Sequence, residues 1–319
     1  MTRVLITGAS GFLGQVLCEA VAQAGYSVRA VMRAEKPPPA AAADSVKICD
    51  IGATTDWGAA LAGVECVIHA AARAHVLHDD AAAASRYFET NEHGTRNLAQ
   101  AAARAGVRRF VYVSSIKVNG EETSAAPYRA TDPPRPQDAY GASKWHAEQA
   151  LQLLAEDSAM QSVIVRPPLV YGPRVRANFL RLLSWVERGW PLPLAAVANR
   201  RSLVSIWNLC DLLVRALEHP RAAGRTWMVS DGEDVSTPEL IRRIAQAMGR
   251  RVNLILVPVP LLRLGAGVVG YGAEFARLCG SLAVDISATR DELGWSPPLS
   301  LDAGLGLTTA WYLQRGLRQ

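Results

Sequence analysis

The sequence predicts an α/β fold, with a doubly wound parallel sheet followed by a smaller mixed lobe. Up to Arg166, short apolar runs alternate with longer Ala-rich, amphipathic stretches. Such alternation is typical of crossover units, which build a parallel sheet with helices on both faces. The short runs are apolar throughout, as expected of strands covered on both sides. After Arg166 prolines interrupt the pattern, which indicates a second lobe.

The pattern places individual elements by their periodicity and their flanking glycines and prolines. We expect strands at 4–6, 28–32, 64–70, 110–114 and 163–166, and helices at 14–23, 56–62, 82–106, 140–156, 207–218, 238–248 and 288–293. On this basis residues 1–166 and about 201–230 form the sheet domain. Residues from about 167 to 200 and 231–319 form the smaller lobe.

The composition excludes several protein classes. Half of the 319 residues are hydrophobic and 20% are charged, which excludes a disordered or collagen-like chain. The net charge of +5 is spread along the chain and suits anionic small molecules as readily as nucleic acid, so it discriminates little between them. We expect a small-molecule partner and no nucleic acid. Five scattered cysteines without a CxxC pair predict neither disulfides nor a zinc site. With no apolar leader at Met1, we expect a cytoplasmic protein.

Two further stretches have simple interpretations. Pro258, Pro260 and Arg263 break the apolar stretch 254–276, so we expect buried or interfacial structure there and no insertion into a membrane. His75 and His78 lie near two aspartates, but a polar loop explains them, and no metal site is expected.

A glycine-rich turn follows the first strand and opens the first helix. Gly8, Gly11 and Gly14 have the spacing GxxGxxG. A turn of this kind lets backbone approach a pyrophosphate, and the helix N-terminus supplies unpaired N–H groups and partial positive charge. The turn therefore predicts a dinucleotide site, although a tight strand–helix turn also requires glycine.

The end of the second strand bears on the choice of cofactor. Many NAD-binding chains carry an acid there, which holds the ribose 2′-hydroxyl. Here the strand ends at Met32 and is followed by Arg33, where a cation could meet a 2′-phosphate. We expect NADP(H) to be preferred and NAD(H) to be possible, with a solvated surface arginine as the alternative.

A Tyr–Lys pair opens the helix at 140–156. Tyr140 and Lys144 are four residues apart and share one helix face. A cation near a phenol stabilises the phenolate, which makes Tyr140 a candidate proton donor and acceptor. Ser115 follows the fourth strand, whose carboxyl end should face the cofactor crevice. Its hydroxyl could bind a carbonyl or alcohol, or could cap a turn.

These features together resemble the extended branch of the short-chain dehydrogenase/reductase family, in particular its nucleotide-sugar enzymes. The resemblance covers nearly the whole chain and implies a Rossmann-like sheet. It implies that Ser115, Tyr140 and Lys144 are catalytic. It implies cofactor contacts at Gly8, Gly11, Phe12, Leu13, Gly14, Arg33, Asp50, Ile51, Ala70, Ala71, Ala72, Asn91, Tyr140, Lys144, Arg166 and Pro167. It implies substrate contacts at Ser115, Asn178, Arg201 and Arg277, and Lys117 beside Ser115 could touch the sugar or be a solvated surface lysine. Arginine suits a diphosphate because its guanidinium binds in a bidentate fork.

Departures from the family pattern narrow the expected reaction. Family dehydratases follow the catalytic hydroxyl residue with Asp-Glu, but Ile116 and Lys117 stand here, so dehydration is not expected. The segments 114–120, 166–173 and 277–282 look most like reductases that make UDP-N-acetylquinovosamine. The resemblance thus implies NADPH-dependent reduction of the 4-keto group of a UDP-4-keto-6-deoxy-N-acetylhexosamine, for surface-polysaccharide synthesis.

Three alternatives stay open at this point. One is an NAD-dependent UDP-hexose 4-epimerase using the same residues. Another is reduction of a steroid-like ketone, which would leave Arg201 and Arg277 without a diphosphate to bind. The third is a dinucleotide-binding protein without catalysis. In this family the helices corresponding to 82–106 and 141–156 commonly build a four-helix dimer interface, so a homodimer is expected, although packing against the sheet explains much of their Ala-rich pattern.

Overall fold

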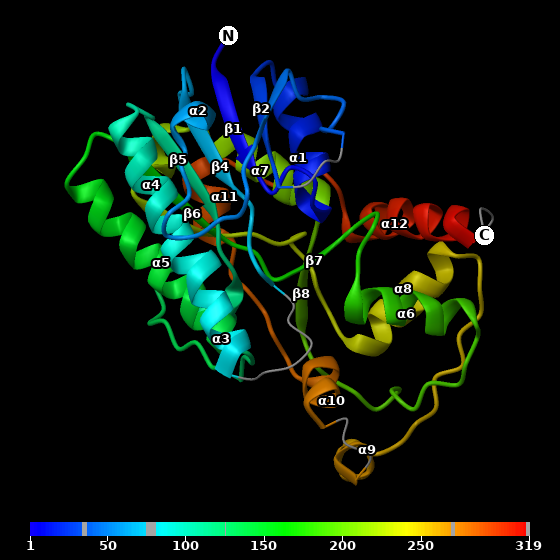
Figure 1. The fold of residues 1–319 in the computed structure, drawn as a ribbon. Coiled ribbons are helices and arrows are strands. Elements are labelled where there is room, and N and C mark those ends of the chain that lie inside the picture. The colour runs from blue at the N-terminus through cyan, green and yellow to red at the C-terminus, as the bar shows by residue number, and fades with distance from the viewer. Residues whose placement is uncertain (34–36, 75–80, 125, 269–271, 317–319) are drawn as a thin grey trace.

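The computed structural model describes residues 1–33, 37–74, 81–124, 126–268 and 272–316. His75, His78 and their neighbouring aspartates lie outside the described residues. A seven-stranded parallel sheet in the order β3-β2-β1-β4-β5-β6-β9 forms the larger part (Figure 1). Its strands are β1 (Arg3–Thr7), β2 (Ser27–Met32), β3 (Asp44–Lys47), β4 (Cys66–His69), β5 (Arg109–Val113), β6 (Gln161–Arg166) and β9 (Arg225–Met228). This confirms the expected fold class.

Alternate residues of the central strands enter separate hydrophobic clusters on the two faces of the sheet. In β1, Val4 and Ile6 belong to one cluster and Leu5 to the other. In β5, Val111 and Phe110 divide in the same way. Successive side chains of a pleated strand point to opposite faces of the sheet, which explains this division. Both faces are apolar because helices cover both.

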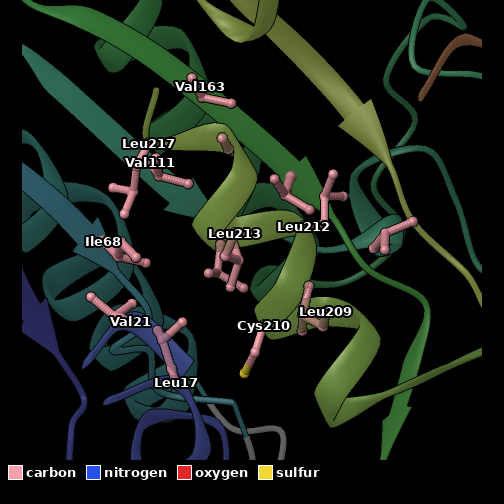
Figure 2. Packing of buried hydrophobic residues seen from close by; sticks show 14 of the residues in the cluster. Leu17, Val21, Ile68, Val111, Val163, Leu209, Cys210, Leu212, Leu213 and Leu217 are labelled. Atoms are coloured by element: carbon pink, nitrogen blue, oxygen red, sulfur yellow. The ribbon is translucent and has the colours of Figure 1, made fainter. Parts of the chain in front are cut away.

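The helices form a layer on each face. One layer contains α1 (Phe12–Gln23), α7 (Ile206–Ala216) and α11 (Ser287–Leu293), and the other contains α2 (Gly58–Leu61), α4 (Gly94–Arg104) and α5 (Ala139–Glu156). Figure 2 shows the first layer, where Leu17 and Val21 of α1 and Leu213 of α7 pack with Ile68 and Val111 of the sheet.

The single helical region expected at 82–106 is interrupted. It consists of α3 (Ala81–Tyr87), a π-helical segment η1 (Phe88–His93) and α4. A Cβ added at Gly94 would lie 2.6 Å from Ile51 Cγ2, so the chain packs very closely where α4 begins. Within η1, Asn91 is buried. π-Helical insertions are frequent at functional sites.

The smaller lobe has a mixed sheet and its own core. Strand β8 (Arg201–Ser205) pairs parallel to β7 (Leu169–Tyr171) and antiparallel to β10 (Asp234–Val235). Helices α6 (Ala177–Glu187), α8 (Thr237–Ala247) and α12 (Leu301–Gly316) contribute to its hydrophobic cluster. Two further helices follow α8 in the chain, α9 (Val259–Val268) and α10 (Gly272–Cys279).

The chain crosses between the two parts several times. Strand β8 pairs in the smaller sheet, whereas α7 and β9, which follow it, belong to the large sheet and its helical cover. We therefore propose a division like the one expected from the sequence, with β8 moved to the smaller lobe.

Candidate active site

The glycine turn between β1 and α1 leaves room for no side chain. A Cβ at Gly14 would lie 2.0 Å from the Gly8 carbonyl oxygen, and one at Gly8 would lie 2.9 Å from the Ala71 nitrogen. Gly11 caps α1 without a side-chain hydrogen bond, and the first turn of the helix carries no acid. Phe12 and Leu13 follow, half-buried. The arrangement fits a pyrophosphate, because backbone N–H groups and the positive helix end are available to an anion.

A chain of buried hydrogen bonds supports this turn. The Ala71 N–H donates to the Thr7 hydroxyl (3.1 Å), which donates to His69 Nδ1 (2.6 Å). The other ring nitrogen contacts the Thr95 hydroxyl (3.0 Å), which donates to the Asn91 carbonyl (2.6 Å). This pattern requires a neutral imidazole with its proton on Nε2. Burial lowers the pKa of His69 to about 3, which keeps the ring neutral.

Asn91 ties the segment after β4 to α5. Its side chain accepts from the Arg73 N–H (2.9 Å) and donates to the Arg73 carbonyl (3.0 Å) and to Ser143 Oγ (3.0 Å). Ser143 in turn donates to the Tyr140 carbonyl (2.8 Å). These hydrogen bonds therefore fix the position of the segment Ala70–Ala72, an expected cofactor contact, relative to the first turn of α5.

Ser115 and Tyr140 are brought together at the carboxyl end of β5. Asp138 caps α5 by accepting from the Gly141 N–H (2.7 Å), which fixes the first turn of the helix. Burial raises the pKa of Tyr140 to about 12, and a hydrogen bond with Ser115 opposes that rise. Two hydroxyls in contact at this strand end can share a proton with a bound alcohol or carbonyl.

Lys144 is buried one turn further along α5. Its ammonium donates to the Val113 carbonyl (2.8 Å) and lies 4.7 Å from the centre of the Tyr112 ring. Burial lowers its pKa to about 7. The sequence predicted that Lys144 would lower the pKa of Tyr140. Instead, burial dominates at both groups, and the pKa of Tyr140 is raised.

The side chain of Arg166, an expected cofactor contact, is engaged by other residues of the protein. Its guanidinium donates from Nε to both carboxylate oxygens of Glu148 (3.0 and 3.2 Å) and from Nη1 to Asn119 Oδ1 (2.9 Å). The side chains of Arg166 and Glu148 are 3% and 0% exposed. Pro167 accepts the Ile116 N–H through its carbonyl (3.0 Å). Both residues therefore bind the segment that directly follows Ser115.

Lys117 was expected to contact the sugar, but its ammonium is engaged elsewhere. It lies 2.6 Å from a Glu121 oxygen and 2.5 Å from an Asp138 oxygen. The ion pair holds the short 3₁₀ helix η2 (Ile116–Val118) against the start of α5. We therefore assign Lys117 to positioning and do not propose it as a substrate contact.

Arg33 and Asp50 meet beside the ends of β2 and β3. Arg33 NH1 lies 3.3 Å from Asp50 Oδ1, and their side chains are 57% and 63% exposed. Asp50 also accepts the N–H of Ile51 (2.9 Å), which is buried. The Arg33 guanidinium, which the sequence suggested as a partner for a 2′-phosphate, is thus accompanied by the carboxylate of Asp50.

The expected substrate residues of the smaller lobe have different surroundings. Arg201 donates through NH1 to the backbone carbonyls of Arg277 (2.5 Å) and Gly280 (2.9 Å). The Arg277 side chain is exposed. Asn178 is exposed at the start of α6 and accepts a hydrogen bond from Arg181 (2.5 Å). The structure thus joins Arg201 to the backbone of α10, while Asn178 is engaged on its own helix.

Sequence reasoning missed three supporting residues: Thr7, Glu148 and Ser143. Glu148 had a signal, because it follows Tyr140 and Lys144 at the same four-residue helical spacing. Thr7 and Ser143 had none, since their partners are 62 and 52 residues away in the chain.

Comparison with known proteins establishes the family. The model of the NAD-dependent epimerase/dehydratase family matches residues 4–230. The chain belongs to this family. It is 42% identical to a UDP-glucose 4-epimerase of Vibrio cholerae, over 99% of this chain and 97% of the relative. It is 26% identical to an N-acetyl-α-D-glucosaminyl-diphospho-ditrans,octacis-undecaprenol 4-epimerase of Escherichia coli O157:H7, over 96% and 94%.

Solved structures share the fold. The UDP-glucuronic acid 4-epimerase of Bacillus cereus, in complex with NAD, has a TM-score of 0.79 and 23% identity, over 98% of this chain and 99% of that one. The comparisons confirm an NAD(P)-dependent enzyme of the expected family. They do not support the finer resemblance to reductases that make UDP-N-acetylquinovosamine, because the 42% identical relative is named an epimerase.

Proposed function

We propose that the protein is a UDP-hexose 4-epimerase that uses NAD. The observation that carries this proposal is that Ser115, at the end of β5, interacts with Tyr140, in the first turn of α5, in a fold whose β1–α1 turn has no room for a side chain at Gly8 or Gly14. The identity of 42% to an enzyme named UDP-glucose 4-epimerase, over nearly the full length of both chains, supports the choice of reaction.

The residues of this chain have distinct tasks in such a reaction. Tyr140 Oη would accept the proton of the sugar C4 hydroxyl and would give a proton back to the C4 oxygen when the alcohol is formed again. Ser115 Oγ would orient the C4 oxygen by hydrogen bonding. Bound NAD would supply a reversible hydride acceptor for C4. The raised pKa of Tyr140 means that its phenolate needs a nearby cation, and Lys144 is the candidate cation on the same helix face.

The pair Arg33–Asp50 favours NAD over NADP. A 2′-phosphate bound to Arg33 would also face the Asp50 carboxylate, 3.3 Å from the guanidinium, and like charges repel. A ribose 2′-hydroxyl can instead donate to that carboxylate. The cofactor preference we propose is thus the reverse of the one that Arg33 alone suggested.

The decisive experiment is incubation of the purified protein with UDP-glucose, UDP-galactose and their N-acetylated counterparts, followed by NMR of the products. Interconversion at C4, with NAD released from the denatured protein, is the expected result. Tyr140→Phe should lose activity, while Tyr312→Phe, which alters a phenol in the smaller lobe, should keep it. Stoichiometric NADPH consumption on a 4-keto UDP-sugar without interconversion of UDP-hexoses would instead establish a reductase.

A further inference from the structure

The segment from Arg250 to Val268, which we call the apolar-basic segment, exposes large hydrophobic side chains. Leu256, Leu261 and Leu264 are 76%, 61% and 68% exposed, and Ile255 is 44% exposed. Scattered single leucines are normal on a protein surface, but several large ones within ten residues mark an interaction surface. The sequence allowed buried or interfacial structure here, and the structure excludes burial of these four side chains.

The charges of the apolar-basic segment all have one sign. Arg250, Arg251 and Arg263 are exposed, and the sequence contains no acidic residue from position 250 to position 273. In α9, Leu261 and Leu264 are three residues apart and therefore share a helix face, and Arg263 lies to one side of that face. Exposed leucines combined with arginines and no acids are the pattern of a helix that lies in the interface of an anionic bilayer.

An adjoining segment adds an aromatic side chain. Leu192 donates to the Asn253 carbonyl (2.9 Å) and accepts from the Ile255 N–H (2.9 Å), so residues near 192 run beside the apolar-basic segment. Two positions earlier, Trp190 is 50% exposed, and the Arg188 guanidinium lies 5.1 Å from its ring. Tryptophan with a neighbouring cation is typical of the level of lipid headgroups.

The position of α9 suits contact with a flat surface. It lies at the extremity of the smaller lobe, away from the large sheet and next to α10 (Figure 1). Among the described residues no helix is long and apolar enough to span a membrane. A surface helix needs neither property, because only its apolar face enters the boundary between headgroups and acyl chains.

We propose that the apolar-basic segment docks the protein on an anionic lipid bilayer. Leu256, Leu261 and Leu264 insert between lipid headgroups, and the three arginines bind the lipid phosphates. The charge complementarity selects a lipid surface over a second copy of this chain, because two copies would bring their arginines together with no acids to pair them. The proposal goes beyond the epimerase reaction and does not depend on it.

Vesicle flotation tests the proposal with the full chain. We expect binding to vesicles of phosphatidylcholine with about 30% phosphatidylglycerol, weaker binding to phosphatidylcholine alone, and loss of most binding when salt rises from about 50 to about 500 mM. The double variant Leu261→Ser/Leu264→Ser should bind the vesicles at least about tenfold more weakly than the wild type, since two apolar anchors are lost. Leu307→Ser, which changes an exposed leucine of α12, is the matched control and should bind like the wild type.

Three results would overturn the proposal. The first is no flotation of the wild type with anionic vesicles at low salt. The second is equal binding by the wild type and the double variant. The third is a dimer, seen by light scattering without lipid, that the double variant alone dissociates, since the patch would then bind a second copy. Conversion of UDP-sugars in solution is a separate readout, which the double variant should retain, so failure of the epimerase proposal would leave this one standing.

Discussion

Glu148 of α5 and Arg166 of β6 form a buried ion pair that also binds Ser114, the residue before Ser115. The pair joins α5 to the end of β6, and the same carboxylate accepts a hydrogen bond from Ser114, the neighbour of Ser115. The side-chain oxygen of Asn119 accepts a hydrogen bond from Nη1 of the same guanidinium. One network thus fixes the helix of Tyr140 and the strand end of Ser115 relative to each other.

Breaking this pair on one side should strongly destabilise the fold. Glu148→Gln leaves the Arg166 charge buried without its counter-ion, and we expect a loss of about 3–5 kcal/mol in the free energy of unfolding. Urea denaturation followed by circular dichroism measures it. Glu292→Gln, at the exposed pair with Arg225, is the control and should change the unfolding midpoint little. Equal effects of the two substitutions would contradict a structural role for the buried pair.

A side chain at Gly14 should destroy the cofactor turn. The Cβ of Gly14→Ala would overlap the Gly8 carbonyl oxygen, so α1 must move away from β1. We expect loss of NAD binding in a titration by tryptophan fluorescence, with a lower melting temperature. Gly306→Ala, in a helix where an added Cβ meets nothing within 4 Å, should bind NAD normally and gain up to about 1 kcal/mol. Normal NAD affinity in Gly14→Ala would show that the turn is not the cradle.

The sequence predicted those features that depend on local pattern. The parallel sheet, the glycine turn and the Tyr140 helix all follow from periodicity and spacing. The strands β3 and β9 escaped prediction because each is a short strand at an edge of the sheet, with polar residues in it. Edge strands lack the continuous apolar run that identifies a central strand.

Two of the expected site residues have ion-pair partners that the sequence did not reveal. Arg166 and Lys117 were expected to meet ligands, yet both pair with carboxylates far away in the chain, Glu148 and Asp138. A sequence shows which side chains carry charge, but partners on other elements decide where that charge points. The Arg33–Asp50 pair illustrates the same limit, because 17 residues separate its members.

The pH dependence of stability should report the buried Lys144. Burial lowers its pKa from 10.5 to about 7, so between those values the unfolded chain binds more protons than the folded protein. The free energy of unfolding should therefore rise with pH through this window. From about pH 7 to about pH 9 we expect the wild type to gain about 2 kcal/mol relative to Lys144→Met, which has no ammonium to titrate. Parallel pH profiles of the two proteins in urea denaturation would refute the lowered pKa.

Asn91 should affect cofactor use more than folding. Asn91→Asp keeps the size of the side chain but cannot donate to the Arg73 carbonyl or to Ser143. The segment 70–73, which we propose to line the cofactor, would then shift, and we expect kcat/KM to fall on the order of tenfold to a hundredfold. Asn208→Asp removes comparable buried donors away from the crevice and should lower stability while the folded enzyme keeps its NAD affinity. If both variants lose only stability, Asn91 has no special part in cofactor binding.

The negative charge of Asp50 should lower the affinity of the protein for NADP⁺. Asp50→Asn keeps the neighbouring amide contact to Ile51 but removes the negative charge beside Arg33, so a 2′-phosphate would meet only the guanidinium. We expect the affinity for NADP⁺ to rise by a factor of about five, since an exposed charge interaction is worth up to about 1 kcal/mol. Arg33→Ala should lower the affinity for NADP⁺ and leave that for NAD⁺ nearly unchanged. Fluorescence titration of nucleotide-free protein with both cofactors measures the ratio. An unchanged ratio in both variants would mean that the pair lies away from the adenosine ribose.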